Sequence, residues 1–396
     1  MKKIIKRILR NVFGIELIRI GKSMGSKVVS LKPESKIEGN VLISYVIDPF
    51  IKDMSESKFN SHTNYWESLQ IAKTFLELGF EVDVINYDNS EFFPKKNYNI
   101  FVGSRINFEK FAQRLNPDCI KIAHLTISHW CYNNKAQCER LLFVQKKKGV
   151  TIYPKKRVEI NFAIENADFA TILGNEFTKN TYRYANKNIY RVPISTPVIF
   201  PWPEKKDFKS CRKSFLWFGS EGMVHKGLDL VLEAFVAMPD FQLIVCGPIS
   251  QENDFEKAYY KELYETKNIQ TLGWIDITGP KFVEITNKCI GLIYPSCSEG
   301  GGGSVITCLH ASLIPIVSYE SSVDIKDDFG FILRNCSLDE IKYSINFVSN
   351  LPTEKLETMA RKAWEFAREN HTRETFSRDY KNAITSILRE RNISSK

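Results

Sequence analysis

The residues best suited to binding and chemistry lie in one short stretch of the 396-residue chain, at positions 290–313. An apolar segment ending at Tyr294 leads to one acidic residue, Glu299, and then to four consecutive glycines, Gly300 to Gly303. Because glycine has no Cβ, a backbone can approach a ligand closely there. At the start of a helix, such a loop also directs free N–H groups and a partial positive charge toward an anion. Since a carboxylate accepts hydrogen bonds from hydroxyls, the stretch predicts a ligand that carries both sugar hydroxyls and phosphates.

The elements that must position this stretch alternate along the chain from about Gly39. In the first half we expect helices at 64–78 and 108–115 and strands at 41–47, 81–87, 98–102, 119–125, 167–173 and 189–192. In the second half we expect a helix at 227–238, a mostly helical region from Leu338, and strands at 214–218, 241–246, 269–272, 290–294 and 314–318. Strands that alternate with helices favour parallel, doubly wound sheets.

These elements predict two domains and a linker. Residues 196–212 contain three prolines and a charged run, which is typical of a linker. We expect a first Rossmann-like domain at 38–195 and a second at 213–375, facing each other across a cleft, where ligands bind in such folds. Residues 376–396 are predicted to form a C-terminal helix that could cross back to the first domain.

Residues 1–37 are predicted to be a basic amphipathic N-terminal segment. Apolar residues between Ile4 and Phe13 recur at helical spacing, and lysines and arginines occupy the other face. We expect no signal peptide, because charges interrupt the apolar residues and no small-residue cleavage site follows. The helix could lie on an anionic membrane surface, or it could pack on its own domain with a solvated basic face.

The composition is typical of a soluble globular protein, with 43% hydrophobic and 26% charged residues. No apolar run reaches the length that spans a bilayer. The nine cysteines are irregularly spaced and include no Cys-x-x-Cys, which favours reduced thiols in the cytoplasm. The net charge of +9 favours an anionic partner without identifying it.

The second half of the chain resembles the nucleotide-sugar half of GT-B glycosyltransferases, specifically the large retaining family that includes bacterial mannosyl- and glucosyltransferases. The motifs that carry this resemblance, in matching order and spacing, are Phe218-Gly219, His225 to Asp229, 231–235, Cys246 to Pro248, Gly273-Trp274 and 295–318. They cover about residues 210–375, while residues 38–195 are similar to the acceptor half only in general pattern. The resemblance implies an α/β fold of the GT-B type, with two doubly wound Rossmann-like domains.

The resemblance also implies a donor site on the second domain. Lys226 matches a family lysine that contacts the donor diphosphate, and Glu299 matches a glutamate that hydrogen-bonds the donor sugar. The alternatives are an exposed lysine at a helix start and an acid that complements the helix dipole. Ser304 could cap the helix. The expected donor-binding residues are Gly219, Ser220, Gly300, Gly301, Gly302, Gly303, Ser304 and Thr307.

Two positions depart from the family pattern. Ser220-Glu221 stands where the family usually has an arginine, so one expected cation is missing. The family's second glutamate, which normally holds the nucleotide ribose, corresponds to Thr307 or to Cys308, depending on the alignment, and neither is acidic. Thr307 could offer one hydroxyl instead.

The first domain supplies fewer candidates. His124 ends an expected strand and resembles a family histidine that faces the donor sugar, so we group it with Glu299 and Lys226 as catalytic candidates; a structural bond is the alternative. Loops at 47–50 and 61–66 replace a glycine-rich loop of the family, and Asp48 and Glu67 are possible acceptor contacts.

The resemblance implies a retaining-type glycosyltransferase, of the hexosyltransferase class, that moves a sugar from a nucleotide-sugar donor to a saccharide or lipid-linked acceptor. Bacterial surface polysaccharide biosynthesis is the setting that the resemblance implies. We expect it in the cytoplasm, or peripheral on the inner face of the cell membrane. The alternative is a non-catalytic relative that binds glycans or scaffolds a polysaccharide-assembly complex.

Other classes of site are not indicated. The sequence has no P-loop, no His-Glu-x-x-His and no Gly-x-Ser-x-Gly. We expect no metal, because no Asp-x-Asp occurs in a suitable loop, and no cofactor. We also expect no nucleic acid, because the basic residues are dispersed.

Overall fold

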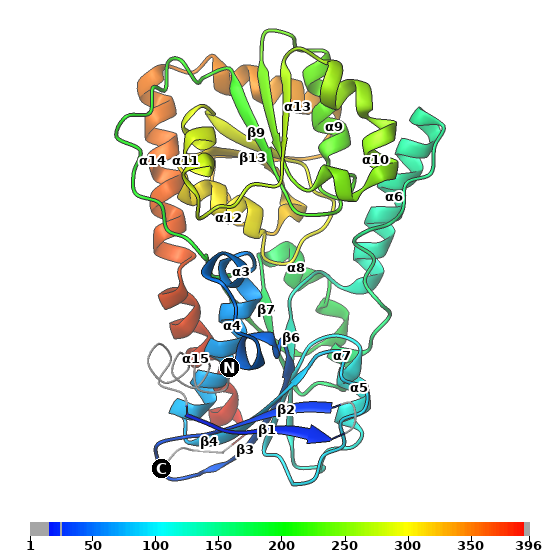
Figure 1. Cartoon of the computed structure of the whole chain (residues 1–396), viewed down its shortest axis with the longest axis vertical. Helices are drawn as coiled ribbons and strands as arrows, with labels where there is room; N and C mark the ends of the chain where they lie inside the picture. The colour runs from blue at the N-terminus through cyan, green and yellow to red at the C-terminus, as the bar shows by residue number, and fades with distance from the viewer. Residues whose placement is uncertain (1–15, 24–25, 392–396) are drawn as a thin grey trace.

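The chain forms two α/β domains stacked along the long axis of the molecule (Figure 1). The structure, a computed structural model, describes residues 16–23 and 26–391. The basic amphipathic helix expected between Ile4 and Phe13 lies outside these residues. Within them, no helix is long and apolar enough to cross a membrane.

The first domain is built on an eight-stranded sheet with the order β1-β2-β4-β3-β5-β6-β7-β8. Its strands are β1 (Glu16–Ser23), β2 (Ser26–Lys32), β3 (Gly39–Tyr45), β4 (Phe80–Asn86), β5 (Ile100–Gly103), β6 (Ile120–Leu125), β7 (Phe169–Leu173) and β8 (Asn188–Val192). From β4 to β8 neighbouring strands are parallel. The chain order reverses between β3 and β5, and their carboxyl ends are therefore where a ligand is expected.

Residues 16–32 differ from the sequence-based assignment, which placed them outside the first domain. They form the antiparallel hairpin β1–β2, and β2 pairs with the edge of β4. Val29 and Leu31 are fully buried there, opposite Val84 and Val82. The alternation of buried and exposed residues in β2 is short, and the longer helical pattern between Ile4 and Phe13 precedes it. The strand is stabilised only by pairing with β4, which follows much later in the chain.

The second domain is built on six parallel strands with the order β11-β10-β9-β12-β13-β14. They are β9 (Ser214–Phe218), β10 (Gln242–Cys246), β11 (Ile269–Gly273), β12 (Gly291–Tyr294), β13 (Ile314–Ser318) and β14 (Phe331–Leu333). Helices cover both faces, so the strands are continuous apolar runs, and Phe215, Leu216 and Trp217 of β9 are fully buried. Here the chain order reverses between β9 and β12.

The helices of the first domain are α2 (Asp48–Ile51), α3 (Glu56–Asn60), α4 (Thr63–Glu77), α5 (Asn107–Ala112), α6 (Trp130–Lys148), α7 (Ala163–Asn166) and α8 (Glu176–Asn180). Those of the second are α9 (Leu228–Val236), α10 (Asn253–Ala258), α11 (Pro280–Asn287), α12 (Gly303–His310), α13 (Leu338–Ser349) and α14 (Thr353–Asn370). Short 3₁₀ or π turns are η1 (Arg183–Ala185), η2 (Ile249–Gln251), η3 (Lys261–Glu265) and η4 (Tyr319–Ser321).

The last helix, α15 (Arg373–Glu390), lies on the first domain (Figure 1). It packs against α4 and β8, where Phe376 stacks edge-on against Trp66 with ring centroids 5.8 Å apart. Phe376 and Tyr380 are fully buried, so this helix is part of the first domain's core. The chain therefore crosses between the domains twice, once through the linker and once between α14 and α15.

Helix α6 also joins the two domains, and the sequence pattern does not predict a helix at these residues. It carries no continuous apolar stripe: its buried residues are Asn133, Gln137 and Val144. Its far end forms ion pairs from Lys147 to Glu233 and from Lys148 to Glu262 in the second domain. A helix whose buried positions are largely polar lacks the periodic signal that marks a core helix.

Candidate active site

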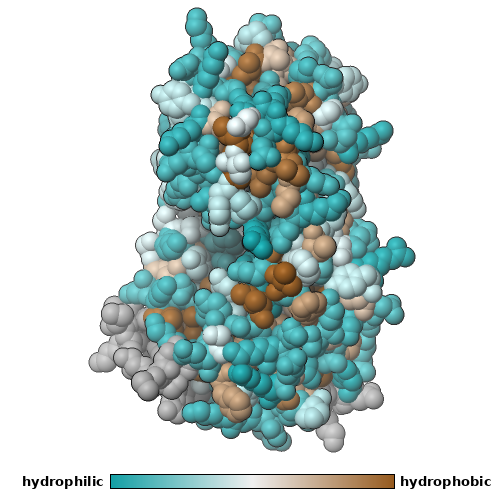
Figure 2. Space-filling model, turned by 90° about the vertical axis from the view of Figure 1, so that its right-hand side faces the viewer, coloured by the Kyte–Doolittle hydropathy of each residue, from teal (hydrophilic) through white to brown (hydrophobic). Residues whose placement is uncertain are grey.

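A cavity of about 370 Å³ lies between the two domains, at the carboxyl ends of both sheets. The surface is hollowed between the domains in Figure 2, and hydrophilic residues surround much of the hollow. The strands on either side of each reversal of chain order, β3 and β5 in one sheet and β9 and β12 in the other, end at the cavity, which is where doubly wound folds bind ligands. Lining residues at strand ends are Tyr45, Ser104, Arg105, Thr126, Gly219, Ser220, Gly247 and Tyr294.

Lys226 and Glu299 form an ion pair at this cavity. Lys226 Nζ lies 2.7 Å from Glu299 Oε1, and it also donates to the Tyr294 hydroxyl at 2.7 Å. The same carboxylate oxygen accepts from the hydroxyls of Tyr294 at 2.9 Å and Ser296 at 3.0 Å. Both side chains are largely buried, at 5% and 17% exposure, so the pair is held in a fixed geometry.

The surroundings of Glu299 keep it ionised. Burial by itself would raise the pKa of this carboxyl, but the charges of Lys226 and His225 outweigh burial and lower the pKa to about 2. An ionised carboxylate only accepts hydrogen bonds, so it suits the hydroxyls of a sugar. Lys226 beside it supplies a point charge that suits a phosphate.

The loop that carries Lys226 is fixed by contacts with the segment after β12. The indole Nε1 of Trp217 donates to the Lys226 carbonyl at 3.3 Å. Gly227 has φ +73°, and a Cβ there would lie 2.4 Å from the Pro295 carbonyl oxygen. Only glycine combines this left-handed backbone with so close an approach to Pro295. The loops that follow β9 and β12 therefore pack tightly against each other, and this packing fixes the position of Lys226.

All four glycines of the run line the cavity, as expected for donor-binding residues, and three of them are also required by packing against protein, which the sequence did not predict. A Cβ at Gly300 would lie 1.9 Å from the Thr126 carbonyl oxygen in the first domain, and one at Gly301 would lie 2.7 Å from Ile194. Gly302 has φ +64°, and its Cβ would meet Val323 at 2.3 Å. Only Gly303 has room for a Cβ, with its nearest neighbour at 3.7 Å.

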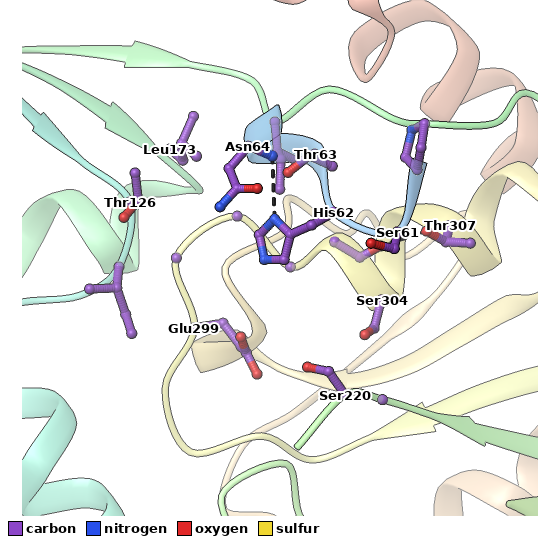
Figure 3. Close-up of a pocket in the computed structure, with 18 of the residues that line it drawn as sticks. Ser61, His62, Thr63, Asn64, Thr126, Leu173, Ser220, Glu299, Ser304 and Thr307 are labelled. Atoms are coloured by element: carbon purple, nitrogen blue, oxygen red, sulfur yellow. Dashed lines mark hydrogen bonds between the residues drawn. The ribbon is translucent and has the colours of Figure 1, made fainter. Parts of the chain in front are cut away.

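The start of α12 borders the cavity. Gly302 occupies the N-cap position and no side chain caps the helix, so Ser304, the second helical residue, is not the cap. Figure 3 shows the Ser304 hydroxyl on the same side of the pocket as Ser220 and Glu299. Thr307 also lines the cavity, although its hydroxyl donates to the Gly303 carbonyl at 2.8 Å. Cys308, the other position aligned with the family's second glutamate, is fully buried and is not among the lining residues.

His124 does not line this cavity. Strand β6 continues to Leu125, and His124 is 1% exposed, with Nδ1 2.8 Å from the Thr171 hydroxyl. Its ring packs edge-on against Tyr45 and Tyr380, and burial lowers its pKa to about 4. Its position under α15 could not be seen from the strand pattern alone, because α15 follows more than 200 residues later.

The two acceptor candidates lie in different places. Asp48 begins α2, pairs with Lys52 at 2.7 Å and is not among the residues that line the cavity. Glu67 of α4 does line it and is fully buried; its Oε1 accepts from the backbone N and hydroxyl of Ser195 at 3.0 and 2.9 Å. Its Oε2 has no partner within the described part of the chain, and burial raises its pKa to about 7.

His62 is a cavity residue that sequence reasoning missed, although the loop at 61–66 was assigned to the acceptor. It precedes α4, and its Nδ1 accepts from the Asn64 backbone N at 3.3 Å. Figure 3 shows its ring pointing into the pocket opposite Glu299. The ring stays accessible to solvent, but enclosure by both domains and the charges of Lys156 and Arg105 lower its pKa to about 4.

Two further cations, Arg105 and Lys156, line the cavity from the first domain. Arg105 follows β5 and has a left-handed backbone with φ +64°, which is uncommon for a residue other than glycine. Neither residue belongs to a sequence motif, so no local signal could have identified them. Across residues 16–23 and 26–391, no group of His, Cys, Asp and Glu is arranged to hold a metal ion.

A scan against models of known protein families finds no match to this sequence, and neither does a search of curated protein sequences. Similarity appears among solved structures. A sucrose-phosphate synthase from Thermosynechococcus elongatus matches with a TM-score of 0.60 and 13% identity, over 88% of this chain and 99% of that chain. Anabaena HepE, in complex with UDP and glucose, matches with a TM-score of 0.53 and 15% identity, over 89% and 100%.

A TarM structure from S. aureus, which contains fondaparinux, alpha-GlcNAc-glycerol and UDP, matches with a TM-score of 0.51 and 14% identity. That match covers 72% of this chain and 54% of TarM, so the chain spans about half of TarM's length. At these identities the similarity establishes the fold. The chain has the GT-B architecture that the sequence predicts, with two doubly wound Rossmann-like domains facing a cleft.

Proposed function

We propose that this chain is a retaining-type glycosyltransferase that moves a sugar from a nucleotide-sugar donor to a saccharide or lipid-linked acceptor. The observation that carries the proposal is the Lys226–Glu299 pair beside the start of α12, in a cavity enclosed by two Rossmann-like domains. A cation, an ionised acid and free helix N–H groups meet there, and together they fit a diphosphate joined to a sugar.

In this proposal the donor lies on the second domain. Lys226 stabilises the negative charge that develops on the diphosphate as its bond to the sugar breaks, and Glu299 holds sugar hydroxyls. Closure of the cavity excludes water, so that transfer competes well with hydrolysis. Sugar-nucleotide binding by a related fold supports this, because HepE structures contain UDP-glucose or UDP with glucose.

The acceptor would enter from the first domain. His62, Asn64 and Glu67 line that side of the cavity, and the accessible ring of His62 suits an acceptor hydroxyl. TarM is a relative in fold whose structure contains saccharide ligands. We propose surface polysaccharide assembly as the setting, and a location in the cytoplasm or at the inner face of the membrane if the acceptor is lipid-linked.

A non-catalytic glycan-binding or scaffold role is the second candidate. Ser220 and Thr307 line the donor side of the cavity, and neither side chain carries a charge for the diphosphate or a carboxylate for the ribose. This observation favours weaker donor binding than the fold alone would suggest.

The test is incubation of the purified protein with a panel of UDP-, GDP-, ADP- and dTDP-sugars and a panel of glycan acceptors. Release of nucleoside diphosphate and mass spectrometry of the product are measured. We expect transfer from at least one donor, and Lys226→Ala should lower the rate by about 10²- to 10³-fold, as the loss of one preorganised charge does.

Glu299→Gln should lower the rate by a similar factor, because the amide cannot hold the ionic contact with Lys226. The matched control is the exposed pair Lys281–Glu284 on α11, whose charges lie 3.3 Å apart in the same domain. Lys281→Ala and Glu284→Gln should transfer sugar at the wild-type rate. Glycan binding without any response to a donor would favour the scaffold.

A further inference from the structure

We propose that Lys156, a residue of the first domain, is a second cation for the donor diphosphate. The inference rests on the proposed function, since it names a further binding residue for the same donor. Lys156 lies in the segment between α6 and α7 and lines the cavity together with Lys226 and Glu299. The diphosphate would then lie between one lysine from each domain.

The backbone of Lys156 is held by two buried side chains of α6. Gln137 Oε1 accepts from the Lys156 backbone N at 2.8 Å, and Asn133 Nδ2 donates to the Lys156 carbonyl at 2.8 Å. Gln137 and Asn133 are 2% and 0% exposed. Two of the few buried positions of this helix are thus occupied by polar residues that fix one loop lysine.

The side chain of Lys156 lies against the loop that follows β9 in the second domain. A Cβ at Gly222 would lie 2.6 Å from Lys156 Cγ and 3.4 Å from its Cε, so only a glycine leaves room for this side chain. Gly222 also has φ +93°, and its backbone N is bound by Glu252. The side chain therefore lies along the loop that also contains Ser220, and both residues line the cavity.

Three carboxylates act on the charge of Lys156: Glu299, Glu252 and the exposed Glu221 beside Ser220. Lys156 forms no ion pair with any of them within residues 16–23 and 26–391, and Glu299 is paired with Lys226. Glu252 is occupied by the backbone N of Gly222 and of Met223. Burial and the like charge of Lys226 lower the pKa of Lys156, as expected for two ammonium groups in one enclosed space.

A bound anion would relieve this repulsion, and a diphosphate carries enough negative charge to satisfy both lysines. The two cations belong to different domains, so the diphosphate would also draw the domains together. A monophosphate is shorter and carries less charge, so it should gain less from Lys156 than a diphosphate does.

The test compares nucleotide binding by the full-length protein and its Lys156→Gln variant. Isothermal titration with UDP, GDP, ADP and dTDP identifies the diphosphate that binds, and the matching monophosphate is titrated in parallel. We expect Lys156→Gln to weaken diphosphate binding roughly 10- to 100-fold, as the loss of a hydrogen bond to a charged group does, and monophosphate binding by less than threefold. Lys156→Arg should retain most of the affinity.

Lys155→Gln is the matched control, because Lys155 is the adjacent, exposed lysine and does not line the cavity. Thermal unfolding of each variant shows that it is folded. If the wild type binds a diphosphate and Lys156→Gln binds it as tightly as Lys155→Gln does, the inference is wrong while the proposed function stands. If the wild type binds none of the nucleotides, the proposed function fails and this inference falls with it.

Discussion

Replacing Gly300 with alanine tests whether the glycine run is a contact surface between the two domains. A Cβ at this position would lie 1.9 Å from the carbonyl oxygen of Thr126 and 2.7 Å from Cα of Ile127. Both are backbone atoms, which cannot rotate away as the end of a flexible side chain can. Close C···O contacts in proteins are about 3.3 Å or longer, so the two segments must separate by roughly 1.4 Å.

The expected effect falls on catalysis more than on folding. Gly300 is not among the residues with positive φ, so alanine fits the local backbone and the second domain should fold normally. The domains, however, could not close fully around the substrates. A misplacement of about 1 Å can lower the rate by about 100-fold, which corresponds to roughly 2.7 kcal/mol of activation free energy.

The assay measures the transfer rate, the affinity for the nucleoside diphosphate and the radius of gyration by small-angle scattering. We expect Gly300→Ala to lower kcat by about 100-fold, to change diphosphate affinity much less, and to enlarge the particle. Gly279→Ala is the control, because its Cβ would meet only the Asp276 carbonyl oxygen at 3.5 Å, an ordinary contact. A Gly300→Ala protein with wild-type transfer and unchanged dimensions would refute this account of domain contact.

Three further outcomes concern stability. Lys226→Ala leaves the Glu299 carboxylate without its cation, and urea unfolding should show a loss of about 3–5 kcal/mol, part of which is recovered in the double variant with Glu299→Gln. The pKa of Glu67 is raised to about 7, so the native state binds the extra proton between about pH 4.5 and 7 and stability falls as pH rises through that window. Glu67→Gln should remove roughly 3 kcal/mol of this pH dependence in unfolding measured from pH 5 to 8. The buried ammonium of Lys206 donates to the carbonyls of Thr286 and Ser312 at 3.1 and 3.2 Å, so Lys206→Met should lower the unfolding free energy by about 2–5 kcal/mol.

Each of these outcomes has a result that contradicts it. If the losses of unfolding free energy in Lys226→Ala and Glu299→Gln simply add in the double variant, the two groups do not interact energetically. An unchanged pH dependence in Glu67→Gln would place the proton on another group. For Lys206, the control is Lys205→Met, because Lys205 is the neighbouring exposed lysine. Equal unfolding free energies of the two variants would show that the hydrogen bonds from Lys206 to the two carbonyls do not stabilise the fold.

Much of the donor side could be predicted from the sequence because its signals are local. Only a few residues separate the apolar run that ends at Tyr294 from the glycines at the start of α12. Each of these patterns determines the local conformation of its own backbone. Gly227 likewise marks the start of α9 one residue after Lys226. Alternation of strands with helices was also enough to predict two doubly wound sheets.

The first-domain side of the cavity could not be predicted in the same way. His124 was expected to face the cavity because it stands near the end of β6, but α15 covers it from the far end of the chain. His62 and Lys156 line the cavity without belonging to a periodic pattern or motif. Their positions depend on loops that other segments hold in place.

The sequence by itself determined most of the parallel strands of the two sheets, and that an acid and a run of four glycines lead from β12 into α12. The tertiary structure alone decided what those glycines touch: Thr126 and Ile194 lie in another domain, more than 100 residues away along the chain. It also brought Lys156 beside Lys226. The physical reason is that periodicity and backbone conformation are properties of neighbouring residues, whereas the packing of one domain on another depends on surfaces that exist only after both have folded.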